Sequence, residues 1–443
     1  MLDLIIRQGR VDDEGPLADI GVRDGRIDQV APAVREEARR ELHAGGKVVI
    51  PGLIEPHIHP DKAFLEQKMP NRSGTLEEAI RNTAALKARY TAEDVRERAE
   101  RVLEWAVRRG TTTLRAHPDV DPIEKLMGVE ALLALRQAYA DVLDLQIVAF
   151  PQEGIIKAPG TEELMREAIR LGADAVGGCP YNEAGITETR RHIDICFRLA
   201  AQHGLPIDMH VDFADDVDDP RYTTAEYIAR KTIAEGYQGR VSLGHVTTLG
   251  AVAPEARASL FELLAQAGIS IVMLPATDLH LSGRKDRRTV RRGLAPAKEL
   301  LAAGVNVAIS SNNIRNAFTP FGLADMLQIG LLLCHTAHMG SPGEQMAVLR
   351  MATVNAARAI GIGDVYGLAA GRQADLLVLD TERVADVLVD QPDRLYVVKR
   401  GQVTVTTHRT VEVHRGPGTR SGERPAAGPS RQADRIREGG VPR

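Results

Sequence analysis

Short apolar runs alternate with amphipathic segments along most of the chain, and this alternation predicts its fold. Apolar residues recur at helical spacing in residues 91–109, 162–171, 187–203 and 255–268. Strand-like runs occupy residues 48–54, 111–117, 145–150, 173–177, 205–210, 240–245, 269–274 and 305–310. Strands that alternate with helices in this way predict an α/β fold, a TIM (β/α)8 barrel, whose active site lies at the carboxyl ends of the strands.

The two ends of the chain carry a different pattern, made of short strands and tight turns. Residues 1–50 contain strand-like runs on either side of an Asp24-Gly25 turn, and residues 374–380 and 394–405 repeat the pattern. We therefore expect residues 1–50 and 367–415 to form one composite β-sandwich domain beside a barrel at residues 51–366. Residues 416–443 are rich in Gly, Pro, Arg and Ser, which is typical of a disordered tail.

Side chains able to bind a metal stand where the predicted strands end. His57 and His59 close the first apolar run, and on a strand this spacing points both imidazoles the same way. A chance His-x-His pair on a polar turn is the alternative interpretation. Later strand ends add His117, Gln152, Glu153, His210, His245, Asn312 and Asn313. Because neutral imidazole binds zinc, iron, cobalt or nickel, this clustering favours a metal centre at the mouth of the barrel.

Composition narrows the classes of partner. The chain has 443 residues, 44% of them hydrophobic, and a net charge of −4 with scattered basic residues, so no nucleic-acid partner is expected. The N-terminus has no charged n-region, and no run approaches the length of a membrane span, so no membrane partner is expected. Cys179, Cys196 and Cys334 are widely spaced, which favours free thiols in a reducing cytoplasm. Assembly into a homo-oligomer is left open.

Several motifs give the chain a resemblance to a known family. They are residues 51–59 (PGLIEPHIH), 145–154 (LQIVAFPQEG), 210–216 (HVDFADD), 244–248 (GHVTT), 280–284 (HLSGR) and 371–376 (GRQADL). In this order they resemble the amidohydrolase superfamily, and within it the cytosine deaminase-like branch, over residues 1 to 413. The chain is also similar to the triazine and N-isopropylammelide aminohydrolases.

The resemblance implies roles for individual residues. His57, His59 and His210 match metal ligands, and Asn312 stands at the remaining ligand position. One divalent metal ion per subunit is implied, zinc or iron, with cobalt or manganese as alternatives.

Around that metal, the resemblance implies that His245 orients or deprotonates the attacking water. Lys62 matches a lysine that stabilises developing charge in the triazine-processing members. Gln152, Phe213, Asn313 and His117 are the residues expected to contact the substrate.

Two positions depart from the family pattern. Asn312 stands where the family has an Asp that binds metal and moves protons, and Asn cannot accept a proton at neutral pH. Phe213 stands where cytosine deaminases carry a Glu that protonates the pyrimidine ring, so cytosine itself is not the expected substrate. His245 is therefore the best-placed base, ahead of Lys62 and Asp278.

These observations lead to one main functional hypothesis and two alternatives. The main one is an amidohydrolase-type, cytosine deaminase-like aminohydrolase. Such an enzyme hydrolyses a non-peptide C–N bond of a small pyrimidine-, triazine- or pterin-like ring and releases ammonia or a substituted amine. The alternatives are an amide, urea or thiocarbamate hydrolase using the same site, and a catalytically silent metal-binding barrel. The H-x-E and P-C-x-x-C signature of the zinc deaminases of nucleic-acid bases is absent from the sequence.

Overall fold

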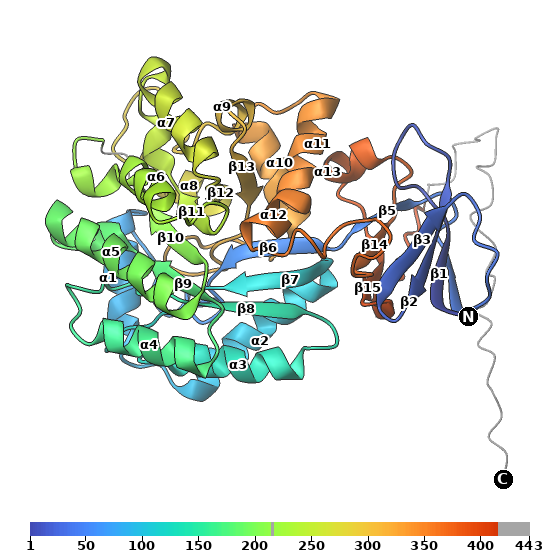
Figure 1. Ribbon diagram of the computed structural model, residues 1–443, viewed down its shortest axis with the longest axis horizontal. Helices are drawn as coiled ribbons and strands as arrows, with labels where there is room; N and C mark the ends of the chain where they lie inside the picture. Colours follow the sequence, from blue (N-terminus) through green and yellow to red (C-terminus); the bar gives the residue numbers. More distant parts are fainter. Residues whose placement is uncertain (214–216, 415–443) are drawn as a thin grey trace, which may run out of the picture.

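An eight-stranded parallel sheet forms the core of the computed structural model, which describes residues 1–213 and 217–414 (Figure 1). Its strands are β6 (Leu53–Ile58), β7 (Thr111–Ala116), β8 (Asp144–Ala149), β9 (Ala175–Gly178), β10 (Ile207–Val211), β11 (Val241–His245), β12 (Ser270–Met273) and β13 (Asn306–Ile309). They pair in chain order, and a parallel bridge between Ile58 and Asn312 joins the two edges. This bridge nearly closes the sheet, so the predicted TIM barrel is confirmed.

Helices surround this sheet, and most of them lie in the connections between its strands (Figure 1). They are α1 (Leu76–Lys87), α2 (Ala92–Arg108), α3 (Met127–Ala138), α4 (Thr161–Leu171), α5 (Ile186–His203), α6 (Ala225–Ala234), α7 (Pro254–Gln266), α8 (Pro275–Leu281), α9 (Ala297–Ala302), α10 (Met326–Thr336), α11 (Pro342–Met351), α12 (Val354–Ala359) and α13 (Val387–Asp390). Short 3-10 turns lie at Pro180–Asn182, Pro220–Tyr222, Thr247–Gly250 and Val384–Asp386. The four helices expected from apolar periodicity correspond to α2, α4, α5 and α7.

The first predicted strand, residues 48–54, is in fact two strands that belong to different sheets. Val48–Pro51 forms β5 outside the barrel, and the barrel strand β6 begins only at Leu53. The break falls at Gly52, where a Cβ atom would lie 2.3 Å from the hydroxyl oxygen of Thr112. The chain therefore needs glycine to pass this close to β7, and the apolar run alone does not reveal the change of sheet.

The chain ends form two further four-stranded sheets, which lie to one side of the barrel (Figure 1). One contains β1 (Leu2–Gly9), β2 (Ala18–Arg23), β3 (Arg26–Ala31) and β4 (Ala38–His43). The other joins β5 to β14 (Leu376–Leu379), β15 (Arg394–Lys399) and β16 (Gln402–Thr406). Ile6, Val22, Val49, Leu376 and Val398 share one buried core between the two sheets.

The two ends therefore contribute unequally to this sandwich. Residues 2–43 complete the first sheet on their own, whereas the second sheet combines both ends through β5. The tail predicted at residues 416–443 lies outside the described residues. Among the described residues, no helix is long and apolar enough to cross a membrane.

Candidate metal and active site

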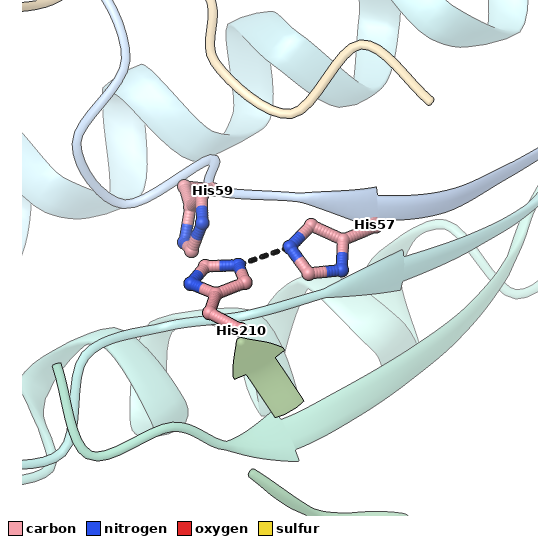
Figure 2. A group of neighbouring side chains, drawn as sticks. All are labelled: His57, His59 and His210. Carbon is pink, nitrogen blue, oxygen red and sulfur yellow. Dashed lines mark hydrogen bonds between the residues drawn. The ribbon is translucent and has the colours of Figure 1, made fainter. Parts of the chain in front are cut away.

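Three histidine side chains meet at the carboxyl ends of β6 and β10. His57 lies on β6 and His59 directly follows it, whereas His210 projects from β10 toward both (Figure 2). One nitrogen from each ring lies within 4.8 Å of the others, and Nε2 of His57 is in very close contact with Nε2 of His210. Two ring nitrogens that face each other so closely need either a proton or a cation between them.

The charge state of these rings suits metal binding. Burial, assisted by the neighbouring His117, lowers the pKa of His57 to about 3. Burial also lowers the pKa of His59 and of His210 well below the usual value for histidine. All three rings are therefore neutral at pH 7, which is the form that donates a lone pair to a metal.

Asn312 lies next to these histidines, at the opposite edge of the sheet. Its backbone N–H donates to the carbonyl oxygen of His57 at 3.1 Å, and its own carbonyl oxygen accepts from the N–H of His59 at 2.9 Å. The side-chain Oδ1 atom is buried and has no hydrogen-bond partner among the described residues. Three neutral imidazoles and an orphaned amide oxygen fit a divalent metal ion.

Close packing of the backbone helps the rings to converge. Gly244, next to His245 on β11, would place a Cβ atom 3.0 Å from Cε1 of His57 and 3.3 Å from Cδ2 of His210. His245 and Asn312 adopt left-handed backbone conformations, with φ angles of 72° and 60°. Such angles are costly for residues other than glycine and tend to persist at functional sites.

A buried carboxylate stands behind the histidine cluster. Oδ1 of Asp208 lies 3.1 Å from Nε2 of His117 and 3.5 Å from Nδ1 of His57, and Arg115 donates to Oδ2 at 2.9 Å. Burial opposes ionisation of this carboxyl, but the facing His117 and Arg115 lower its pKa well below the usual value. An ionised Asp208 favours the tautomer of His57 that carries its proton on Nδ1, which leaves Nε2 free to bind a metal.

A small cavity of about 10 Å³ opens next to this cluster. Most of the residues predicted for the site line it, namely His59, Lys62, Gln152, His210, Phe213, His245, Asn312 and Asn313. We call this space the inner cavity. It has room for about one water molecule, so side chains of its lining must move to admit a ring.

Two residues singled out in the sequence lie away from the inner cavity. His117, expected to contact the substrate, is fully buried behind His57, and the two rings stack with centroids 3.8 Å apart. Glu153 points away from the cavity and accepts from Lys87 at 2.9 Å. The position of His117 suits a role in holding Asp208 and His57 in place.

His245, like Lys62, lines the inner cavity. Its Nδ1 lies 2.6 Å from Oδ1 of the buried Asp278, on α8. Burial raises the pKa of Asp278, while the facing His245 acts to lower it. Phe213 stacks on the same imidazole, with ring centroids 3.8 Å apart and planes 11° from parallel. The His245 ring is thus held on its edge and on one face.

Lys62 is fully buried and held by two contacts. Its Nζ donates to Oδ1 of Asp119 at 2.7 Å and to Oε1 of Gln152 at 3.0 Å. Lys87 lies 2.7 Å from the second oxygen of Asp119, so one carboxylate serves two ammonium groups. Since Lys62 also lines the inner cavity, its remaining N–H can reach a bound molecule.

Several residues of the site were not found from the sequence. Tyr181, Thr277 and Phe318 line the inner cavity, and Glu55, Arg115 and Asp208 lie in the layer beneath it. The last three each stand two residues before a histidine of the cluster, at His57, His117 and His210. Because side chains two apart on a strand share a face, this spacing was a usable signal.

The sequence is similar to those of known amidohydrolases. The sequence model described as the amidohydrolase family matches residues 40–405. The chain is 30% identical to N-isopropylammelide isopropyl amidohydrolase from Pseudomonas sp. (strain ADP), over 91% of this chain and 97% of that protein. It is 31% identical to pterin deaminase from Rhizobium rhizogenes, over 87% of each chain.

A solved structure shows a similarly extensive likeness. The fold superimposes on 5-methylcytosine deaminase from Klebsiella pneumoniae, liganded with 5-fluorocytosine, with a TM-score of 0.87 and 35% sequence identity. The match covers 93% of this chain and 99% of that one. The likeness therefore extends over the barrel and the sheets formed by the chain ends.

Proposed function

Because the chain belongs to the amidohydrolase family, we propose that it is a metal-dependent hydrolase that removes ammonia or a substituted amine from a small N-heterocycle. The observation that supports this most directly is the cluster of His57, His59 and His210 beside the inner cavity. The named relatives fit the same reaction type, since they include a pterin deaminase and an N-isopropylammelide hydrolase.

The metal site in this proposal consists of His57, His59 and His210, with the Oδ1 atom of Asn312 as a weaker donor. When bound there, zinc or iron would supply a Lewis acid that activates water for attack on a ring carbon. Asp208 acts through His57 by holding its proton on Nδ1.

His245 is the proposed proton carrier. Since its Nδ1 donates to Asp278, its Nε2 is left as an acceptor, able to take a proton from water and pass it to the leaving nitrogen. An amine leaves more readily once it is protonated. The pair of His245 and Asp278 therefore assumes the proton transfer that Asn312 cannot perform.

Lys62 and Gln152 are the proposed contacts to the ring. The Lys62 ammonium faces the inner cavity from a buried position, where a positive charge stabilises negative charge that develops on a ring nitrogen or oxygen. Phe213 offers an apolar face instead of the carboxylate found at this position in cytosine deaminases. Rings that need no carboxylate to protonate a ring nitrogen therefore suit this site best.

A reducing cytoplasm is the proposed location. The structure leaves Cys179, Cys196 and Cys334 unpaired, as expected of a protein that does not depend on disulfides.

The proposal is tested by a screen of aminopyrimidines, aminotriazines and pterins with protein loaded with zinc or iron. We expect release of ammonia, or of isopropylamine from N-alkylated triazines, together with the corresponding oxo ring. Hydrolysis of simple amides, ureas or thiocarbamates without release from any ring amine would contradict the proposal and favour the alternative hydrolase.

A further inference from the structure

A second, wider cavity of about 450 Å³ opens beside the inner cavity and shares Phe213 with it. We call it the outer cavity. Half of its lining residues are charged, namely the basic Arg221, Arg284, Lys285 and Arg291 and the acidic Glu77 and Asp219. Its walls thus differ in character from the inner cavity, where Lys62 supplies the positive charge.

Aromatic side chains connect the two spaces. Phe213 faces both, and its ring stacks on His245 within the inner cavity. Tyr181 lines the inner cavity and Tyr222 the outer one, and their rings stack with centroids 5.5 Å apart. The linings of the two cavities therefore meet at aromatic rings.

The basic residues of the outer cavity differ in how far they are already neutralised. Arg221 is paired with Asp219 at 2.7 Å, and Arg291 with Asp286 at 2.7 Å. Arg284 instead donates to the backbone carbonyl of His280 at 2.7 Å and forms no salt bridge within residues 1–213 and 217–414. Lys285 is exposed and forms no salt bridge in the part of the chain that the structure describes.

The local sequence strengthens this positive charge. Residues 284–292 (RKDRRTVRR) contain six basic side chains against the single carboxylate of Asp286, in a chain whose net charge is −4. Three of these basic residues line the outer cavity, so the expectation of scattered basic residues does not hold for this segment. Such a concentration attracts anions and raises their local concentration at the entrance to a site.

We propose that the outer cavity binds an anionic oxygen group, a carboxylate or a phosphate, carried by the substrate whose ring occupies the inner cavity. The inference rests on the proposed function. Arg284 and Lys285 supply positive charge that no salt bridge neutralises among the described residues, and Glu77, in the same lining, limits it. A single-stranded nucleic acid fits less well, since such binding uses a basic groove that follows several phosphates, whereas this cavity is one recess with acidic groups in its wall.

Matched pairs of compounds test this inference. The pairs are pterin with pterin-6-carboxylate and 2-amino-1,3,5-triazine with 4-amino-1,3,5-triazine-2-carboxylate, and the readouts are kcat/KM and the affinity of the metal-loaded protein. We expect the carboxylated member of at least one pair to be preferred, and Lys285→Ala to reduce that preference by about two- to fivefold. Lys285→Ala should leave kcat/KM for the neutral member unchanged.

Further variants separate this effect from general loss of charge. Arg287→Ala removes a basic residue of the same segment that does not line the outer cavity and should leave the preference intact. Glu77→Gln should increase the preference, because it removes an opposing carboxylate. Raising the NaCl concentration to about 0.5 M should weaken the preference through screening.

Two results would overturn the inference. One is that kcat/KM and affinity are the same for the neutral and the anionic member of each pair. The other is tight binding of a deoxycytidine octanucleotide that Lys285→Ala abolishes while the carboxylated rings gain nothing. Ammonia release from the neutral members reports separately on the proposed function, because it does not depend on the outer cavity.

Discussion

Nδ1 of His245 lies 2.6 Å from Oδ1 of Asp278, in a fully buried contact between the end of β11 and helix α8. The contact fixes both the orientation of the imidazole and the ring nitrogen that carries the proton. Because the neutral amide of Asn312 cannot accept a proton, this pair is the arrangement best suited to moving protons during hydrolysis.

Asp278→Asn should therefore lower kcat by about 10²- to 10³-fold while leaving the metal content unchanged. The amide can donate a hydrogen bond to Nδ1, which favours the opposite tautomer and protonates the nitrogen that faces the substrate. Steady-state kinetics together with metal analysis check this outcome. Loss of bound metal in this variant would mean that His245 binds the metal itself.

Asn312→Asp should tighten metal binding by about tenfold or more, since a carboxylate is a stronger ligand than an amide oxygen. The left-handed backbone at φ 60° tolerates both residues, and the Oδ1 atom is free of other partners in the described structure. Competition with a chelator measures the affinity. We expect the maximal rate to stay within about tenfold of the wild type, because His245 already carries protons.

Asn313→Asp is the matched control for this variant. Oδ1 of Asn313 accepts from the amide of Asn316 at 2.7 Å and is thus already engaged. This substitution should not increase the metal affinity. A rate increase of several orders of magnitude in Asn312→Asp would instead identify Asn312 as an impaired catalytic position and favour the silent barrel.

Asp208→Asn should weaken metal binding by about 10- to 100-fold, although the residue is not among the proposed ligands. The neutral amide no longer holds the proton of His57 on Nδ1. His117→Asn keeps the carboxylate of Asp208 beside Nδ1 of His57, so it should weaken metal binding less than Asp208→Asn does. Equal affinities of wild type and Asp208→Asn, in protein shown to be folded by circular dichroism, would contradict this positioning role.

The sequence predicted the histidines of the site, because each of them stands at the end of an apolar strand-like run. His57 and His59 are two apart at a strand end, and His210 and His245 follow apolar runs in the same way, so the barrel geometry brings them together. The break at Gly52 was missed, because Val48–Pro51 and Leu53–Ile58 are equally apolar and only the close approach to Thr112 separates them.

Ion pairs between residues far apart in the sequence could not be predicted from local patterns. Asp208 and Arg115 each look like an isolated polar residue within a strand, and only the closed barrel shows that they neutralise one another. The contact of Lys62 with Asp119 is similar, since it joins the loops that follow β6 and β7. The outer cavity likewise depends on where residues 284–292 lie relative to Phe213.

A cluster of buried carboxylates beside Lys62 affects stability. Oxygens of Asp61, Asp119 and Glu124 lie within 4.8 Å of one another, and neither oxygen of Glu124 has a hydrogen-bond partner among the described residues. Burial, together with the charges of Asp61 and Asp119, raises the pKa of Glu124 well above its usual value. The folded protein therefore holds this proton more tightly than the unfolded chain.

It follows that the contribution of Glu124 to stability is greatest at low pH and is lost as pH rises from about 4.5 through the folded-state pKa. Glu124→Gln should remove this loss and raise Tm at pH 8 by at least about 2 °C. Thermal melts between pH 5 and pH 8 measure the effect, with the exposed Glu130→Gln as control. A variant less stable than wild type at pH 8 would show that the ionised carboxylate is needed.

The central claim is that His57, His59 and His210 hold a metal on which amine release depends. The most direct measurement is ammonia or amine release, per mole of bound metal, for wild type and His210→Ala before and after chelation and reloading. We predict that activity disappears on chelation and returns with zinc or iron in the wild type, and that His210→Ala binds no metal and releases nothing. Full metal occupancy in His210→Ala, or unchanged release by the chelated wild type, would contradict the claim.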